Sequence, residues 1–482
     1  MTKKELRQQV ACEWLEQNYL QFGYLRHDIV TDRLQIRVAN LEGSGGQEFR
    51  GSGVTSEQAQ SASEHLNSKA SEPLNVSSAD LYWRNLTDKD INTMVCQCVN
   101  ESGVNISITE MWTALKSDMV PTVHPIREWL KSLPPYTPDQ PDWIDWLASQ
   151  VRVKNNDNID NLRGNQLPAA PMENNTTPSY TTLHDTTPSA DRLWRACFKK
   201  WFVAMVASWM KDEVVNHTVL VLVGRQGIFK TTWLDHLIPP ELRAYSSKLP
   251  LSGQISKDDR LRLCENAMLN IDELDAICGR EMNIVKSLLT STDVNERAAY
   301  GRLKERKVRL ASFCASTNNR EFLTDVTGNR RWLPFEVENI QNPFHITLPY
   351  QLIYAQAKEL VLQGKFIYWF ESDEIEQLEQ HNDSFRAQDS EEQLLPILFD
   401  VPAEGKGEFM TTAEISDKLV TYGGIKKPMA LNRLGVLLGK AGYRTVTRGS
   451  RDARVRGWIV YQRDNEQINA NRRLLIHECV TV

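Results

Sequence analysis

The chain is poor in cysteine, and its eight cysteines are scattered. They are Cys12, Cys96, Cys98, Cys197, Cys264, Cys278, Cys314 and Cys479. Several stand in apolar runs, where a free thiol packs as a small hydrophobic group, so we expect them to be reduced. Cys96 and Cys98 are close in sequence, but no second Cys/His pair follows at the spacing of a zinc finger, which disfavours a zinc site.

Long apolar segments and an excess of positive charge are also absent. The opening residues MTKKELRQQVACEWLEQ contain no apolar signal core, and no run approaches the roughly 18 apolar residues of a membrane span. The sequence therefore predicts a cytoplasmic protein that does not contact membranes. The formal net charge is −6, so any binding of nucleic acid must come from local basic patches.

Length and composition indicate several folded domains. Hydrophobic residues make up 41% and charged residues 24% of the 482 residues, a balance that allows sizeable cores in a soluble chain. At about 150 residues per domain, the length suggests roughly three units. No internal repeat is evident. Two polar stretches rich in Gly, Ser, Asn, Pro and Thr, at 41–79 and 154–190, are expected to separate the folded parts.

Apolar periodicity predicts what lies between these stretches. Residues 191–209 carry an apolar stripe at helical spacing, whose tryptophans we expect to pack in a core. Two helices are expected at 411–422 and 429–441, followed by strands at 444–447 and 458–462, the pattern of a winged helix. We expect an N-terminal segment (1–40), a flexible linker or loop (41–79), a helical domain (80–153), a linker (154–190), an α/β core with a parallel sheet (191–345), a helical extension (346–400), a winged-helix-like domain (401–463) and a tail (464–482).

A strand, a glycine-containing loop and a helix are predicted at 218–233. Thr218–Val223 is a continuous apolar run, as expected for a parallel strand buried on both faces. A loop that turns into a helix N-terminus offers convergent backbone N–H groups and the positive end of the helix dipole, which suit phosphate oxygens. The candidate ATP-binding residues are Gly224, Arg225, Gln226, Gly227, Ile228, Phe229, Lys230, Thr231 and Thr232.

The spacing from Gly224 to Lys230 follows the Walker A pattern and predicts individual roles. Lys230 would reach the β- and γ-phosphates of ATP, and the Thr231 hydroxyl would ligate Mg²⁺. Phe229 stands where the pattern has its second glycine. Its backbone N–H is retained, but its φ is less free than that of glycine. Taken alone, the loop is equally well interpreted as an ordinary turn.

Two further apolar strands end in polar residues. Ala267–Ile271 leads into Asp272 and Glu273, which would hold the metal and activate the attacking water, respectively. One carboxylate after a strand is a common cap, but a pair that follows a phosphate loop favours catalysis. Val308–Ser316 leads into Thr317 and then Asn318, whose amide can bond both the γ-phosphate and the water.

Arg330 and Arg331 follow this amide in TGNRRW (327–332). A planar guanidinium binds phosphate through two parallel hydrogen bonds, which suits an arginine finger that reaches the γ-phosphate in a neighbouring subunit. A structural salt bridge for one of the two arginines is the alternative.

Together these motifs resemble the virulence-associated E family, relatives of the superfamily 3 helicases within the AAA+ ATPases. The blocks that carry the resemblance are GRQGIFKTTW (224–233), NIDELDAI (270–277), VKSLLTSTDVNERAAYGR (285–302) and ASTNNREFLTDVTGNRRWLP (315–334). Residues 105–150 look like the helical segment that precedes this ATPase. The resemblance implies an α/β AAA+ core and a ring-forming motor in phage or mobile-element DNA replication. It also implies a hairpin between the second and third strands that enters the ring channel.

Basic residues concentrate in two regions. Residues 297–309 hold six basic residues and one acidic residue, and we expect contacts to single-stranded DNA from Arg302, Lys304, Arg306 and Lys307. A solvated charged face is the alternative, and Arg297 could be a second finger. The expected wing carries Arg444, Arg448, Arg451, Arg454 and Arg456, which suit phosphates of duplex DNA or contacts with protein.

Three functional classes follow from the sequence. The favoured one is a hexameric DNA helicase or translocase that hydrolyses ATP with Mg²⁺ and threads single-stranded DNA. The alternative is a nucleotide-dependent DNA-binding switch or defence component that does not unwind DNA, which the phenylalanine in the loop keeps open. A small-molecule kinase is the least favoured class. A monomeric kinase needs no arginine from a neighbouring subunit, so it would not explain the paired arginines.

Overall fold

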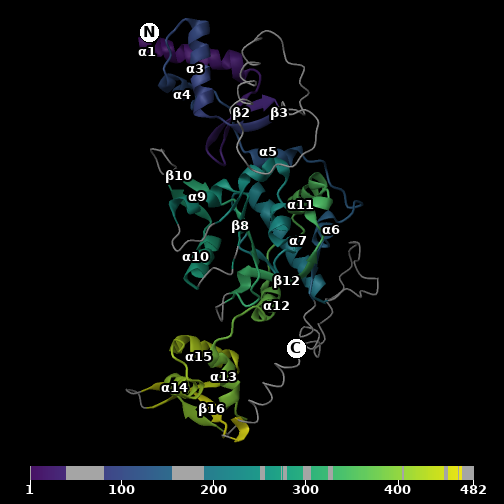
Figure 1. Ribbon diagram of the computed structural model, residues 1–482, viewed down its shortest axis with the longest axis vertical. Coiled ribbons are helices and arrows are strands. Elements are labelled where there is room, and N and C mark those ends of the chain that lie inside the picture. Colours follow the sequence, from purple (N-terminus) through teal and green to yellow (C-terminus); the bar gives the residue numbers. More distant parts are fainter. Residues whose placement is uncertain are drawn as a thin grey trace. The chain divides into compact units, whose positions relative to one another are not determined.

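The computed structural model describes residues 2–39, 81–154, 189–249, 256–272, 274, 279–296, 305–323, 329–403, 407–449, 454–464 and 466–468 (Figure 1). The contacts divide the chain into two units, Met1–Pro134 and Pro135–Val482, with Cys264–Asn266 grouped with the first. Nearly all of the two predicted linkers, 41–79 and 154–190, lies outside the described residues. Among the helices that are described, none is long and apolar enough to cross a membrane.

The first unit combines a small sheet with helices. Its strands are β1 (Leu25–Asp28), β2 (Arg33–Ala39), β3 (Leu81–Asn85) and β4 (Thr122–Val123), in the order β3-β2-β1-β4. Its helices are α1 (Lys3–Leu15), the π-helical turn Glu16–Leu20, α3 (Asp88–Ser102), α4 (Ile108–Leu115) and α5 (Pro125–Ser132). Capping boxes begin α1, α3 and α4, at Thr2, Thr87 and Ser107, so the sequence itself specifies where these helices start.

The prediction of a purely helical domain at 80–153 differs from this structure. Leu81–Asn85 is a strand that pairs with β2, and residues of α1, β1 and β2 share one hydrophobic core with α3 and α4. The N-terminal segment is therefore part of a folded α/β unit. The strand pairing was missed because it joins segments on either side of residues 40–80.

The second unit is built on a six-stranded sheet. Its strands are β5 (Val151–Val153), β6 (Val219–Val223), β7 (Ser246–Lys248), β8 (Met268–Ile271), β11 (Ser312–Thr317) and β12 (Trp332–Ile340), in the order β5-β12-β6-β11-β8-β7. All neighbours are parallel except β5, which is antiparallel to β12. Every residue of β6, β8 and β11 is buried. The three predicted apolar strands are thus confirmed as the centre of a mixed α/β fold, with the third beginning at Ser312 and not at Val308.

Helices cover this sheet (Figure 1). They are α6 (Trp143–Ala148), α7 (Ser189–Met210), α8 (Lys230–Asp235), α9 (Lys257–Glu265), α10 (Gly279–Thr290), α11 (Tyr350–Gln363) and α12 (Ser372–Asp383). The α7 tryptophans Trp194, Trp201 and Trp209 are fully buried. Their indole N–H groups donate to the carbonyls of Ala148, Phe313 and Ala267. The expectation that these tryptophans pack in a core is confirmed.

The end of the predicted helical domain belongs to this second unit. Strand β5 pairs with β12, and the side chain of Gln356 in α11 accepts from Ile144 N and donates to Asp142 Oδ1, at 2.9 and 2.8 Å. The predicted boundary at 153 therefore lies too late in the chain, because these two hydrogen bonds tie residues 142–144 to α11 and one strand ties residues 151–153 to the sheet.

The C-terminal part forms its own hydrophobic cluster. It contains α13 (Ser390–Leu398), β13 (Phe399–Asp400), β14 (Glu408–Met410), α14 (Thr412–Gly423), α15 (Leu431–Lys440), β15 (Arg444–Arg448) and β16 (Val455–Gln462). Strand β16 pairs antiparallel with β13, β14 and β15. The predicted two helices and two strands are confirmed, and α13 adds its apolar side chains Leu395, Ile397 and Leu398 to the same cluster.

A buried arginine joins three segments of the second unit. Arg309, 1% exposed, donates to the carbonyls of Leu288, Leu289 and Ser291 at the end of α10, and to those of Asn216 and Ala311. A cation at a helix C-terminus also interacts favourably with the helix dipole. Although Arg309 belongs to the basic run 297–309, it holds the fold together and cannot contact DNA.

We predict that Arg309→Lys lowers the free energy of unfolding by about 2–4 kcal/mol, because one ammonium cannot reach carbonyls in three segments. Urea denaturation measures the effect. Arg306→Lys is the matched control, since Arg306 lies nearby in the same run with its side chain 75% exposed. The control should change stability by less than about 0.5 kcal/mol. Equal effects of the two substitutions would contradict the structural role of Arg309.

Candidate nucleotide site

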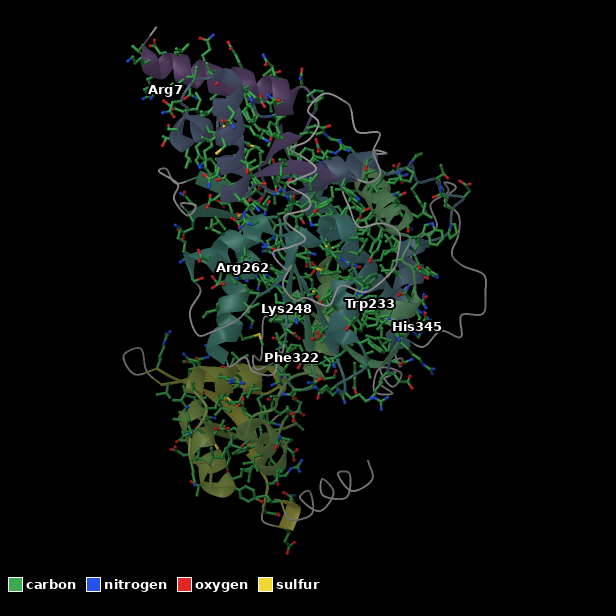
Figure 2. The ribbon with its side chains drawn as sticks, turned by 45° about the horizontal axis from the view of Figure 1, so that its top comes forward. Arg7, Trp233, Lys248, Arg262, Phe322 and His345 are labelled. Carbon is green, nitrogen blue, oxygen red and sulfur yellow. The ribbon has the colours of Figure 1, made fainter. Side chains whose placement is uncertain are left out.

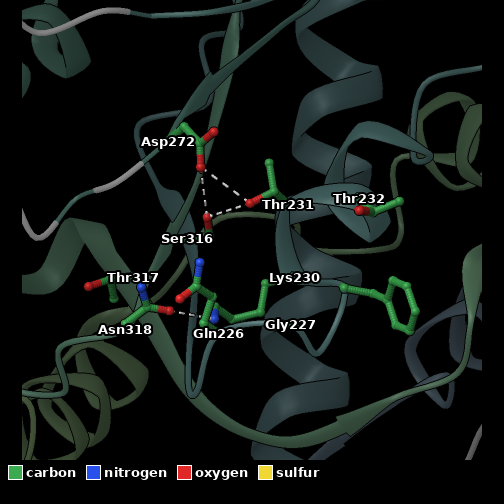
Figure 3. A pocket seen from close by; sticks show the side chains of 10 residues that line it. Gln226, Gly227, Lys230, Thr231, Thr232, Asp272, Ser316, Thr317 and Asn318 are labelled. Atoms are coloured by element: carbon green, nitrogen blue, oxygen red, sulfur yellow. Dashed lines mark hydrogen bonds between the residues drawn. The ribbon is translucent and has the colours of Figure 1, made fainter. Parts of the chain in front are cut away.

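A pocket lies where the central parallel strands end (Figure 3). It is lined by Gln226, Gly227, Phe229, Lys230, Thr231, Thr232, Asp272, Ser316, Thr317 and Asn318. These residues come from the segment after β6, the residue after β8 and the end of β11. Ligands of open α/β sheets bind at the carboxyl ends of the strands, so the pocket occupies the position expected for a ligand site.

The loop after β6 depends on two glycines. A Cβ on Gly224 would lie 2.9 Å from the carbonyl oxygen of Val337 in β12, a contact too close for any other residue. Gly227 has φ 85°, which side chains with a Cβ adopt only with strain. The backbone N–H of Gly224 also bonds the Thr317 carbonyl at 3.1 Å. The loop is therefore fixed against both β12 and β11.

Phe229 adopts the conformation that a glycine would adopt freely. Its φ of 65° and ψ of 19° are left-handed, and it directly precedes α8. For a residue with a Cβ this conformation costs about 1–2 kcal/mol. Phe229 lines the pocket, and its ring contacts the Phe344 ring, with centroids 6.4 Å apart. The sequence departure from the Walker A pattern is thus a point of backbone strain beside the pocket.

Lys230 is held at the end of this loop. Its residue exposure is 7%, and its ammonium donates to the carbonyls of Gly224 and Arg225 at 2.7 and 2.8 Å. A third bond, of 3.0 Å, reaches Asn318 Oδ1. The structure therefore brings Lys230 together with Asn318, as the alignment of their parallel strands predicts.

Thr231, Asp272 and Ser316 form a second polar group (Figure 3). Thr231 Oγ1 lies 3.2 Å from Asp272 Oδ1 and 2.9 Å from Ser316 Oγ, and Ser316 Oγ lies 3.3 Å from the same carboxylate oxygen. Thr231 and Asp272 are the two predicted metal ligands. Ser316 was not singled out from the sequence, where it is the small polar end of an apolar strand.

Lys248 is a further residue that the sequence did not reveal (Figure 2). It ends β7, and its Nζ lies 2.6 Å from Asp272 Oδ2. Burial raises the pKa of Asp272, but the Lys248 ammonium and the hydroxyls of Thr231 and Ser316 outweigh it and hold this pKa below its ordinary value. Asp272 is consequently an anion with a cationic partner. The short polar strand SSK (246–248) gives no sequence signal for this pairing.

Arg330 and Arg331 do not reach this pocket. They form a 3₁₀ turn, Asn329–Arg331, immediately before β12, and β12 begins at Trp332, opposite the first residue of β6. The pocket lies beyond the last residue of β6, about 13 Å further along the strand direction. Asn382 of α12, fully buried, bonds the carbonyls of Asn329 and Trp332 and so fixes the turn. The two arginines thus lie at the opposite edge of the sheet.

The basic segment is only partly described. Strands β9 (Asp293–Glu296) and β10 (Glu305–Val308) form an antiparallel pair, which agrees with the expected hairpin; its place in a ring channel stays a prediction. Arg306 is exposed on β10 and pairs with Asp293 at 2.8 Å, and Lys307 follows it on the same strand. Arg302, Lys304 and the predicted catalytic Glu273 lie outside the described residues.

The backbone strain at Phe229 predicts a difference in stability between two substitutions at this position. Phe229→Gly should be more stable than Phe229→Ala by about 1 kcal/mol, because both remove the ring but only glycine relaxes the left-handed backbone. Thermal denaturation measures the difference. At Leu362, an exposed position of α11, glycine should instead be less stable than alanine by about 1 kcal/mol. The same order of stability at both positions would rule out strain at Phe229.

Comparisons with known proteins agree with the motifs. Residues 174–387 match the family model of the virulence-associated protein E-like domain. This range includes every predicted site residue from Gly224 to Arg331. Residues 174–387 are therefore a virulence-associated protein E-like domain, and the resemblance suggested by the sequence is confirmed for this part of the chain.

Solved structures provide more distant matches. The apo structure of the NrS-1 C-terminal region (305-718) is 11% identical, with a TM-score of 0.41, and the match covers 91% of this chain and 96% of that one. Two A-form apo structures of the NrS-1 C-terminal region are 10% identical, with TM-scores of 0.39 and the same coverage. No curated protein matches the chain in sequence.

Proposed function

We propose that residues 191–345 form an AAA+ P-loop core that binds and hydrolyses Mg-ATP, and that the chain is an oligomeric motor on DNA in phage or mobile-element replication. One observation carries the proposal. At one edge of a parallel sheet, Lys230 meets Asn318 at 3.0 Å while the oxygens of Thr231 and Asp272 converge at 3.2 Å. Phosphate groups and a hard cation need such neighbouring sets of donors and acceptors.

The Lys230 ammonium is suited to a triphosphate. Its three bonds described above are to neutral oxygens, and an anionic phosphate oxygen is a stronger acceptor. Asn318, the residue after β11, accepts from the same ammonium as the two loop carbonyls. The pair would therefore stabilise charge on the terminal phosphate, and the loop N–H groups would position the rest of the chain of phosphates.

The oxygen donors at Thr231 and Asp272 fit Mg²⁺, which prefers hydroxyl, carboxylate and phosphate oxygens and keeps several waters. When bound, Mg²⁺ neutralises charge on the phosphates. Lys248 would give up its bond to Asp272 Oδ2 or share that carboxylate. Glu273, the next residue along the chain, would orient or deprotonate the attacking water. The product is ADP and phosphate, with the proton of the water taken by that carboxylate.

The arginine turn supports an oligomer. Arg330 and Arg331 lie at the sheet edge opposite to the pocket of their own chain, so an arginine finger could only serve a neighbouring chain. Closed rings arise when the same contact repeats from head to tail. We therefore propose a ring, hexameric as in the helicases that the motifs resemble, with Arg330 or Arg331 completing the site of the next subunit.

DNA contacts are proposed for the β9–β10 hairpin and the C-terminal strands. The hairpin presents the exposed Arg306, and we assign Arg302 and Lys304 to the same single-stranded DNA contact. The Nζ of Lys307 is buried, so the contact that the sequence predicts for Lys307 is not part of this proposal. In the C-terminal part, which we propose to be winged-helix-like, Arg444, Arg454 and Arg456 are exposed and suit phosphates of duplex DNA. A nucleotide-dependent switch without unwinding is the second candidate, favoured by the strained Phe229 beside the phosphate site.

The first test is ATP hydrolysis with and without single-stranded DNA at stated salt. Lys230→Ala should lower the rate at least about a hundredfold, because it removes the cation from the terminal phosphate, and DNA should stimulate only the Lys230-dependent rate. Lys365→Ala, which removes an exposed lysine of the same unit, should leave the rate unchanged. ATP binding without turnover in the unsubstituted protein would favour the switch, and turnover that survives Lys230→Ala would refute the site.

Mixing two inactive variants tests the arginines. We expect Lys230→Ala and the double variant Arg330→Ala/Arg331→Ala each to be inactive alone. Mixed and allowed to exchange subunits, they should regain hydrolysis at roughly a quarter of the interfaces, where an intact Lys230 faces an intact arginine pair. Thermal denaturation checks that each variant folds. No recovery in verified mixed oligomers would assign the arginines to their own chain or to structure.

A further inference from the structure

Three aromatic rings gather beside the pocket. Phe344 is 66% exposed, and its ring centroid lies 6.4 Å from that of Phe229, with an interplanar angle of 82°. The centroid of the His236 ring lies 5.6 Å away at 89°. Phe344 is therefore nearly perpendicular to both neighbours. Perpendicular rings form an open corner, where a further flat ring can stack on one face and meet the edge of another.

The fold places this corner at the same sheet edge as the phosphate loop. Phe344 lies in the 3₁₀ turn Pro343–His345 that follows β12, and β12 runs parallel to β6. Its backbone N–H is bonded by Asn342 Oδ1 at 3.0 Å. His236 follows α8, and Tyr350 Oη donates to its carbonyl at 2.6 Å. The ring positions are thus held by the backbone on both sides.

Phe229 and His236 share one side of α8 with Thr232. Thr232 and His236 are four residues apart and lie on the same face of α8. Phe229 precedes the helix, and its ring lies on this side because the Phe344 ring contacts both Phe229 and His236, so the three residues form one row. Within this row the His236 ring Nδ1 bonds the Thr232 carbonyl at 2.7 Å. Figure 3 shows Thr232 apart from the group of Thr231, Asp272 and Ser316. The aromatic row therefore lies on a different side of the helix from the metal-binding oxygens.

This arrangement gives the triphosphate a direction. Lys230 and Asn318 would hold its terminal phosphate, and Thr231 with Asp272 would hold the metal. The other end of the chain of phosphates, which bears the sugar and base, then lies towards Thr232 and the aromatic row. A nucleobase is flat and apolar on its faces, and it stacks well on aromatic side chains.

We propose that Phe229, His236 and Phe344 bind the base of the nucleoside triphosphate. The proposal rests on the phosphate site proposed above and adds the part of the ligand that this site leaves unassigned. It also assigns a role to Phe229. This residue replaces the second glycine of the loop, and its ring contacts Phe344, where we place the base. The exposed ring of Phe344 would become covered when nucleotide binds.

Calorimetry with Mg-ATP and with magnesium tripolyphosphate separates base from phosphate. The unsubstituted protein should bind ATP more tightly than tripolyphosphate. Phe344→Ala should weaken ATP binding roughly tenfold and leave tripolyphosphate binding unchanged, and Phe344→Trp should retain ATP affinity. Leu362→Ala, which removes an apolar side chain of similar exposure on α11, should change neither.

Two results would overturn the proposal. One is equal affinity of the unsubstituted protein for ATP and tripolyphosphate; the other is ATP affinity that does not change in Phe344→Ala. If Lys230→Ala still abolishes the binding of both ligands in either case, the phosphate site stands and only the base assignment fails. If neither ligand binds the unsubstituted protein, both assignments fail.

Discussion

The parallel register of β6, β11 and β8 is the constraint on which the site depends. Thr317 pairs with Val223, and Ala315 pairs with both Val221 and Ile271, so the three strands end within a residue or two of one another. All three strands are buried on both faces. A shift in register would therefore move a polar residue from the strand ends into the apolar core, so the register is strongly specified. Because β11 lies between β6 and β8, Asn318 and Ser316 stand between the phosphate loop and Asp272. The polar groups at the strand ends thus converge because the buried apolar residues of β6, β11 and β8 fix the strands in register.

Two charged groups and one strained residue meet in the site. A nearly buried ammonium at Lys230 is bonded to backbone carbonyls, Asp272 is held as an anion by Lys248, and Phe229 is left-handed. The left-handed Phe229 lowers local stability, as strained residues at functional sites commonly do, whereas Lys230 and Asp272 are held by the bonds described above. The proposed Mg-ATP complex would supply an anion for Lys230 and a cation for Asp272. This complementarity links the electrostatics of the pocket to the proposed function.

The sequence was sufficient wherever a local pattern specifies a structure. Continuous apolar runs identified the three central strands, and helical spacing identified the buried tryptophans of α7. Patterns failed where the partner is distant or the environment decides. Strand β3 pairs across a long gap in the chain, Lys248 meets Asp272 only because β7 lies next to β8, and nothing in the sequence distinguishes the buried Arg309 from its exposed neighbour Arg306. The roles of Glu273, Arg302 and Lys304 remain predictions from the sequence and its resemblance.

The most direct measurement is an experimental structure of the protein with Mg²⁺ and a non-hydrolysable ATP analogue. The proposed site predicts a triphosphate along the Gly224–Thr232 loop, with its terminal group at Lys230 and Asn318 and the metal beside Thr231 and Asp272. A neighbouring chain should then bring Arg330 or Arg331 to the same phosphate. An analogue bound away from this loop, or a pocket that stays empty at saturating nucleotide, would contradict it.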